Sequence, residues 1–175
     1  MAMNATEDMN AAKGQTRVQE LTRTQRAIAH RSAEARATVP DLELSTEVDM
    51  AACAMLRREA RCSVTAMLVR ACALALRECP RANGAYRDER FELYSRINVG
   101  VAIATEEAYT VATVFDADSE SLAELTELID GLARRARAGE LTAPEGSGAE
   151  FTLSHPGTYG AGSSSTIPSH PQVAT

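Results

Sequence analysis

The sequence predicts an α/β fold, a two-layer sandwich in which helices cover one face of a mixed β-sheet. Two runs with strand character, residues 97–104 and 109–115, follow each other closely, and the first is the more apolar. A long, nearly all-apolar helix is predicted before them and a leucine-rich helix after them. We therefore expect the run at 97–104 to lie in the interior of the sheet.

The N-terminal part predicts a tail followed by a helix. Residues 1–16 show no apolar periodicity, so we expect a disordered tail there and one domain over residues 17–175. Thr22 has the hydroxyl that favours a helix N-cap, and the helix-forming composition after it ends before Pro40. The first ordered element is therefore expected to be an α-helix.

The stretch DLELSTEVDM, residues 41–50, predicts a strand. Leu42, Leu44 and Val48 all fall on alternate positions, which is typical of a strand with one buried face. Asp49 can cap a short helix directly after it. This stretch should therefore pack against the domain.

Residues that favour helix starts and ends predict the bounds of the remaining elements. Ser63 is expected to cap the long apolar helix, which ends at Pro80, and a strand is predicted near 91–95. Ser119 is expected to cap the last long helix, which closes at Gly139. One stripe of that helix should face the sheet: Leu122, Leu125, Leu128 and Leu132.

Composition and charge narrow the classes of function. A net charge of −6 without a strong concentration of basic residues opposes binding to nucleic acid or to an anionic membrane surface. No apolar run approaches the roughly 18 residues of a membrane span, and the first residues do not resemble a secretion signal. The four cysteines match no metal-binding or redox spacing. We therefore expect a cytoplasmic protein without metal, nucleic acid or membrane partners.

The stretch FTLSHPGTYG, residues 151–160, is the candidate for catalytic chemistry. It places Ser154 just after a short strand, on a turn that contains proline and glycine. A reacting serine or acceptor needs a base, and the sequence holds three histidines. His155 is adjacent, but neighbouring residues at a strand end tend to point to opposite faces. His30 and His170 fit ordinary structural or surface positions better.

Six segments in one order resemble the acyltransferase domain of the dihydrolipoyl acyltransferases of 2-oxo acid dehydrogenase complexes. They are LTRTQRAIAHR, SVTAMLVRACALALRECPRANGAY, INVGVAIATEEAYTVATVFDADSESLAEL, LARRARAGEL, EFTLSHPG and PSHPQVA. The resemblance runs from Val18 to Ala174. It implies the fold of the chloramphenicol acetyltransferase group, a two-layer α/β sandwich that assembles into trimers.

The resemblance also implies a reaction and site residues. Members of the family transfer an acyl group from a thioester such as an acyl-coenzyme A, and Ser154 matches the family serine that donates a hydrogen bond to the oxyanion. Arg26 is the best positional match to an arginine that, in the acetyltransferase group, pairs with the aspartate of the catalytic histidine motif. Without that aspartate, Arg26 fits an exposed helix charge equally well.

The sequence departs from the family in several places. The family histidine lies in an H-x-x-x-D-G motif beyond the PQ-A segment, and no such motif occurs in the 175 residues. No lipoyl domain precedes Val18, so we expect no lipoyl group on this chain. Gln172 to Ala174 are expected to begin a strand that the family continues, which predicts a fold incomplete at its C-terminus. The turn SHPG has a histidine where the family usually has an asparagine.

Three accounts of the missing base stay open. A separate polypeptide could supply the H-x-x-x-D-G segment, because the family site lies between subunits of a homo- or hetero-oligomer. Alternatively, the chain is a truncated relative that folds without activity. In the third account His155 itself is the base.

The sequence therefore predicts an acyltransferase that uses a coenzyme A or carrier thioester. Its acceptor would be a lipoyl thiol in trans or the hydroxyl of a small metabolite. The alternative is a non-catalytic assembly or binding subunit of the same fold.

Overall fold

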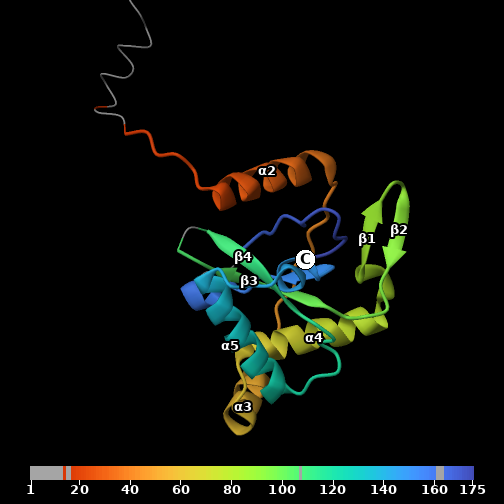
Figure 1. Ribbon diagram of the computed structural model, residues 1–175. Helices are drawn as coiled ribbons and strands as arrows, with labels where there is room; N and C mark the ends of the chain where they lie inside the picture. Colours follow the sequence, from red (N-terminus) through yellow and green to blue (C-terminus); the bar gives the residue numbers. More distant parts are fainter. Residues whose placement is uncertain (1–13, 15–16, 107, 161–163) are drawn as a thin grey trace, which may run out of the picture.

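The computed structural model describes residues 14, 17–106, 108–160 and 164–175 (Figure 1). The tail predicted for residues 1–16 lies outside this part of the chain, apart from Gly14. Among the described residues, no helix has both the length and the apolar character needed to cross a membrane.

A three-stranded mixed sheet lies at the centre of the molecule. Its middle strand β3 (Val99–Ala104) pairs antiparallel with β4 (Tyr109–Val114) and parallel with β5 (Phe151–Leu153). The predicted α/β fold with a mixed sheet is confirmed, and so is the interior position of the most apolar strand.

The two faces of β3 carry side chains of different size. Val99 and Val101 are almost fully buried in the main apolar core. Because side chains alternate along a strand, Gly100, Ala102 and Ala104 lie on the opposite face. A Cβ on Gly100 would come within 2.7 Å of a Val111 methyl carbon, so β3 is closely covered at that point. Towards Ala104 the small residues leave room above the sheet.

Helix α4 (Val64–Glu78) is one of two helices that cover the apolar face of the sheet (Figure 1). Ser63 caps it as predicted, because its side chain accepts a hydrogen bond from the backbone N–H of Ala66. The N–H of Ser63 in turn donates to the Thr126 hydroxyl at 3.1 Å. The first turn of α4 is therefore tied to its neighbouring helix.

That neighbour is α5 (Leu122–Ala138). Its N-cap is Ser121, so the prediction of Ser119 was wrong by half a turn. Ser121 gains a capping box with Glu124, in which each side chain accepts from the other residue's N–H. Gly139 closes the helix as predicted, with a left-handed φ of 73°.

The buried stripe of α5 differs from the predicted row of leucines. Leu128 is 45% exposed, and Leu122 is only partly buried. With 3.6 residues per turn, these two leucines lie towards either side of the face that packs on the sheet. The buried residues repeat at helical spacing instead: Leu125, Ile129, Leu132 and Ala136.

The opposite side of the sheet faces α2 (Arg23–Thr38), as Figure 1 shows. Thr22 caps this helix as predicted, in a capping box with Gln25. A short helix α6 (Ala143–Ser147), which the sequence reasoning missed, begins at another capping box on Thr142.

A separate hairpin projects beside the main sheet (Figure 1). It consists of β1 (Gly84–Arg87) and β2 (Arg90–Leu93), so only its second strand was predicted. Its turn residues Asp88 and Glu89 both have positive φ. Non-glycine residues seldom adopt this conformation, which is why the sequence did not reveal the turn.

The strand predicted within residues 41–50 is absent. The described residues place no strand beside it, and Leu42, Leu44 and Val48 are 83%, 86% and 69% exposed. A strand forms only where a neighbouring backbone accepts and donates its ladder hydrogen bonds. The following helix α3 (Ala51–Ala60) does form, with the N–H of Ala51 donating to Asp49 at 2.8 Å.

The strand expected at Gln172 to Ala174 is likewise reduced to one isolated bridge between Gln172 and Ala85. This bridge connects the last described segment, residues 164–175, with the hairpin. The segment is thereby held across the face of the sheet that α2 also faces.

Candidate active site

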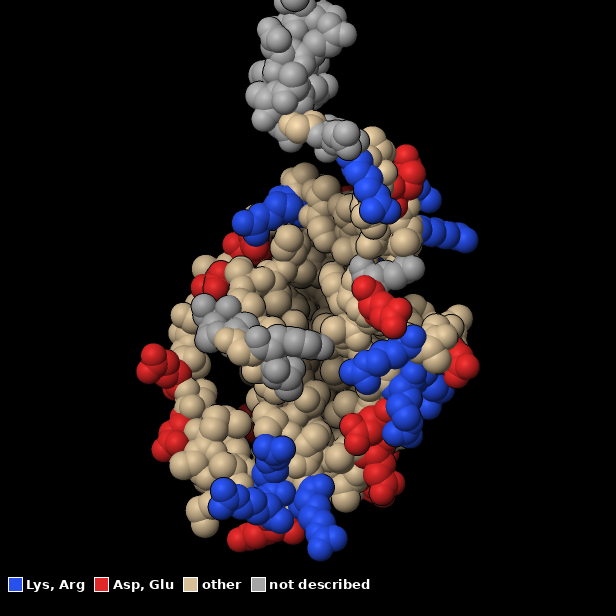
Figure 2. Space-filling view, turned by 90° about the vertical axis from the view of Figure 1, so that its left-hand side faces the viewer, with Lys and Arg blue, Asp and Glu red and all other residues tan. Residues whose placement is uncertain are grey.

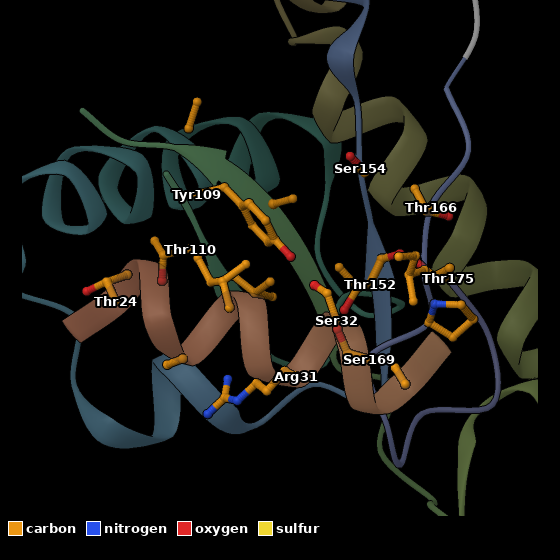
Figure 3. Close-up of a pocket in the computed structure, with 18 of the residues that line it drawn as sticks. Thr24, Arg31, Ser32, Tyr109, Thr110, Thr152, Ser154, Thr166, Ser169 and Thr175 are labelled. Carbon is orange, nitrogen blue, oxygen red and sulfur yellow. The ribbon is translucent and has the colours of Figure 1, made fainter. Parts of the chain in front are cut away.

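A pocket of about 690 Å³ lies between α2, the small-residue face of the sheet and the segment 164–175. On one face of the molecule, acidic and basic side chains are interspersed (Figure 2). Figure 3 shows the lining of the pocket in close-up. Its floor includes Ala102 and Ala104 of β3 and Val111 of β4. The small side chains of β3 therefore make the room for the pocket.

Ser154 lines this pocket directly after the end of β5. Thr152 and Ser154 are two residues apart and thus lie on the same face of the strand. In Figure 3 both side chains extend from β5, with Ser154 farther along the strand and apart from Ser32 of α2. Ser154 is exposed, and among the described residues its hydroxyl has no recorded hydrogen-bond partner. It is therefore available to a bound molecule.

Thr152, in contrast, is fully engaged with the last residues of the chain. It is 7% exposed, and its hydroxyl donates to the Gln172 side-chain carbonyl at 2.8 Å. The Gln172 amide donates to Ala149, and the Thr175 hydroxyl donates to the carbonyl of Thr152 at 2.9 Å. These bonds fix β5 to the segment 164–175. This network was not predicted from the sequence. The alternation of side chains along the strand EFTLS could, however, have placed Thr152 on the same face as Ser154.

His155 is half-buried, and its ring lies on the side of α4. Its Nδ1 atom is 3.4 Å from the hydroxyl oxygen of Thr65, the second residue of α4. His155 also lines the pocket, next to Ser154.

The other predicted candidates lie away from the pocket. Arg26 is exposed and is not part of the lining. His30 is exposed near Glu34, with 3.7 Å between Nδ1 and the carboxylate oxygen, and His170 is exposed and also outside the lining. Among the histidines of the described residues, only His155 therefore lines the pocket.

Two arginines that the sequence reasoning did not single out line the pocket from α2. Arg23 and Arg31 are eight residues apart, with Ala27 midway, so they lie on one face of the helix, whereas Arg26 points elsewhere. The helical spacing of these two arginines could have identified them from the sequence. The described lining includes no Asp or Glu, so its charge is positive. Just before β5, partial burial raises the pKa of the Glu150 carboxyl.

The pocket thus offers an exposed serine hydroxyl that no other described residue engages, the adjacent His155, and hydroxyl-rich walls with two arginines. Such a site can hold an anionic molecule and donate a hydrogen bond to a developing negative charge.

Comparisons with known proteins agree with this description. A family model described as 2-oxoacid dehydrogenases acyltransferase (catalytic domain) matches residues 13–175. The chain is similar to the dihydrolipoyllysine-residue acetyltransferase component of the pyruvate dehydrogenase complex of Rickettsia bellii, with 31% identity over 155 residues. That alignment covers 83% of this chain and 37% of the relative.

A second relative is the dihydrolipoyllysine-residue succinyltransferase component of the 2-oxoglutarate dehydrogenase complex of Bacillus subtilis. It is 31% identical over 166 residues, which is 89% of this chain and 40% of the relative. The chain therefore spans about two fifths of the length of the curated relatives that it matches.

Among solved structures, the dihydrolipoamide acetyltransferase of Azotobacter vinelandii is similar, with a TM-score of 0.87 and 25% identity. The match covers 93% of this chain and 72% of that chain. Crystallographic and enzymatic work on that protein addressed the roles of a serine, a histidine and an asparagine in its catalytic mechanism.

Proposed function

This chain belongs to the 2-oxoacid dehydrogenase acyltransferase (catalytic domain) family, and from that premise we propose that it transfers an acyl group from a coenzyme A or carrier thioester. The observation that carries the proposal is the hydroxyl of Ser154, which makes no hydrogen bond to another described residue and lies in a positively charged pocket. Acyl transfer passes through a tetrahedral oxyanion, which a positioned hydroxyl stabilises by donating a hydrogen bond. Arg23 and Arg31 supply charge that suits the phosphates of coenzyme A.

The base that removes the acceptor's proton comes, in this proposal, from an H-x-x-x-D-G segment outside these 175 residues. The described lining contains no Asp or Glu and one imidazole, that of His155, whose Nδ1 lies 3.4 Å from the Thr65 hydroxyl oxygen. The similar A. vinelandii enzyme was studied for the catalytic roles of a serine and a histidine. This supports the proposal that Ser154 donates to the oxyanion while a histidine on that segment acts as the base.

The acceptor we propose first is a lipoyl thiol in trans, because the similar proteins are named as dihydrolipoyllysine-residue acyltransferases. The test gives the chain acetyl-coenzyme A, a polypeptide that carries an H-x-x-x-D-G segment, and either a reduced lipoyl domain or a small alcohol. We expect a thioester on the lipoyl domain, detected by its mass and by its release with hydroxylamine. Acylation of the alcohol alone would identify the metabolite hydroxyl as the acceptor. Transfer to neither would favour the non-catalytic binding subunit.

We also propose that the chain works as an oligomer, in line with relatives that are components of multienzyme complexes. The supporting observation is the stretch 41–50, which has no partner strand among the described residues and whose Leu42 and Leu44 are more than four-fifths exposed. Exposed strand-like apolar segments promote association. Light scattering at micromolar concentration should therefore give a mass above that of one chain. The double substitution Leu42→Asp and Leu44→Asp should lower it, and a monodisperse single-chain mass for the unmodified protein would refute the proposal.

A further inference from the structure

The backbone at Ser154 is not held by the sheet. The parallel ladder of β5 on β3 ends with the pair Leu153 and Val101, and Ser154 is the first residue beyond it. Its side chain has no recorded hydrogen bond among the described residues either. Since a hydrogen-bond donor for an oxyanion must be held in place before the reaction, something else has to fix this residue.

The next residue supplies that anchor. The Nδ1 atom of His155 lies 3.4 Å from the Thr65 hydroxyl oxygen, at the long end of hydrogen-bond distances. The other edge of the ring lies over Gly157, where a Cβ would come within 3.1 Å of Nε2. The ring is therefore held between Thr65 and the turn that follows it. Glycine at position 157 is what leaves space for it.

Thr65 belongs to a well-fixed part of the molecule. It lies in the first turn of α4, next to Ala66, which is completely buried. Ser63 caps this turn and donates its backbone N–H to Thr126 of α5. A contact with Thr65 therefore fixes the end of β5 to the helical layer.

From this arrangement we infer that His155 and Thr65 form a positioning pair that holds the Ser154 hydroxyl towards the pocket. His155 lines the pocket beside Ser154, but in this inference it acts by positioning Ser154 and accepts no proton, because Nδ1 faces Thr65 and Nε2 faces Gly157. This inference rests on the proposed acyl transfer and assigns it two further residues. It also gives a role to the histidine of SHPG, at a place where the family usually has an asparagine.

The kinetic test removes the contact without changing the shape of the side chain. Thr65→Val replaces the hydroxyl with a methyl group and should lower kcat roughly 10- to 100-fold with little change in KM, as expected for a misplaced catalytic group. Thr65→Ser keeps the hydroxyl and His155→Asn keeps a polar atom near the position of Nδ1, so both should retain most of the activity. In a Ser154→Ala background, Thr65→Val should cause no further loss, because its effect runs through that hydroxyl.

Other results would overturn the inference. Loss of activity in His155→Asn with normal activity in Thr65→Val would make His155 the base. Equal additional loss in the Ser154→Ala background would mean a general structural effect.

Hydrogen–deuterium exchange tests the anchor without any assay of activity. In Thr65→Val, the amides of Ser154, His155 and Gly157 should exchange roughly 5- to 10-fold faster, the factor that one net hydrogen bond supports. The amides of β3 should be unchanged. If no acyl transfer occurs with any acceptor, the proposed function fails, whereas unchanged exchange at Ser154 to Gly157 refutes the anchor.

Discussion

Adding a polypeptide that carries an H-x-x-x-D-G segment should raise acyl transfer by this chain about 10²- to 10⁴-fold, the range that a general base supplies. The physical reason is the composition of the pocket. Its described lining presents Ser154, two arginines, no Asp or Glu, and one histidine, His155, whose Nδ1 faces Thr65. Alone, the chain should therefore cleave acetyl-coenzyme A at the background rate. A thiol-release assay with and without the added polypeptide measures the difference.

The matched control is the same polypeptide with alanine in place of its motif histidine. It should bind without restoring the rate, because a base and not a missing strand limits the reaction. The prediction fails if the chain alone turns over and His155→Ala abolishes that turnover.

The substitution Ser154→Ala should separate stability from activity. Removing an exposed hydroxyl that has no recorded partner among the described residues should change the free energy of unfolding by less than about 1 kcal/mol. Loss of an oxyanion donor should lower kcat about 10²- to 10³-fold. Thermal melts beside the assay of the complemented enzyme measure both quantities.

Ser169→Ala is the matched control for this substitution. Ser169 is another exposed serine in the pocket lining, and its side chain makes no recorded hydrogen bond within the described residues. We expect it to leave both stability and kcat nearly unchanged. Parallel losses of stability and activity in Ser154→Ala would instead assign a structural role to that serine.

Sequence reasoning succeeded where a structure depends on residues close in the chain. Thr22 and Ser63 cap their helices as predicted, and Gly139 closes α5. Each of these features involves hydrogen bonds to residues only a few positions away. The interior place of β3 also followed from its composition alone, since a strand buried on both sides must be apolar.

Prediction from the sequence failed where the structure depends on how the elements pack against each other. Leu128 is as apolar as Leu125, yet only Leu125 lies against the sheet. The alternation of Leu42 and Leu44 is real, but the described residues give that segment no partner strand. The spacing of apolar residues indicates which side chains can be buried, but it does not indicate which element will cover them.

The sequence by itself therefore determined the caps of two helices, the end of α5, the mixed α/β fold and the family. Only the tertiary structure decided where the neighbouring groups point. It placed Arg23 and Arg31 in the pocket instead of Arg26, and it directed His155 towards Thr65, which is 90 residues away in the chain. Contacts over such separations depend on how the sheet and helices pack together, and no pattern along a single stretch of sequence contains that information.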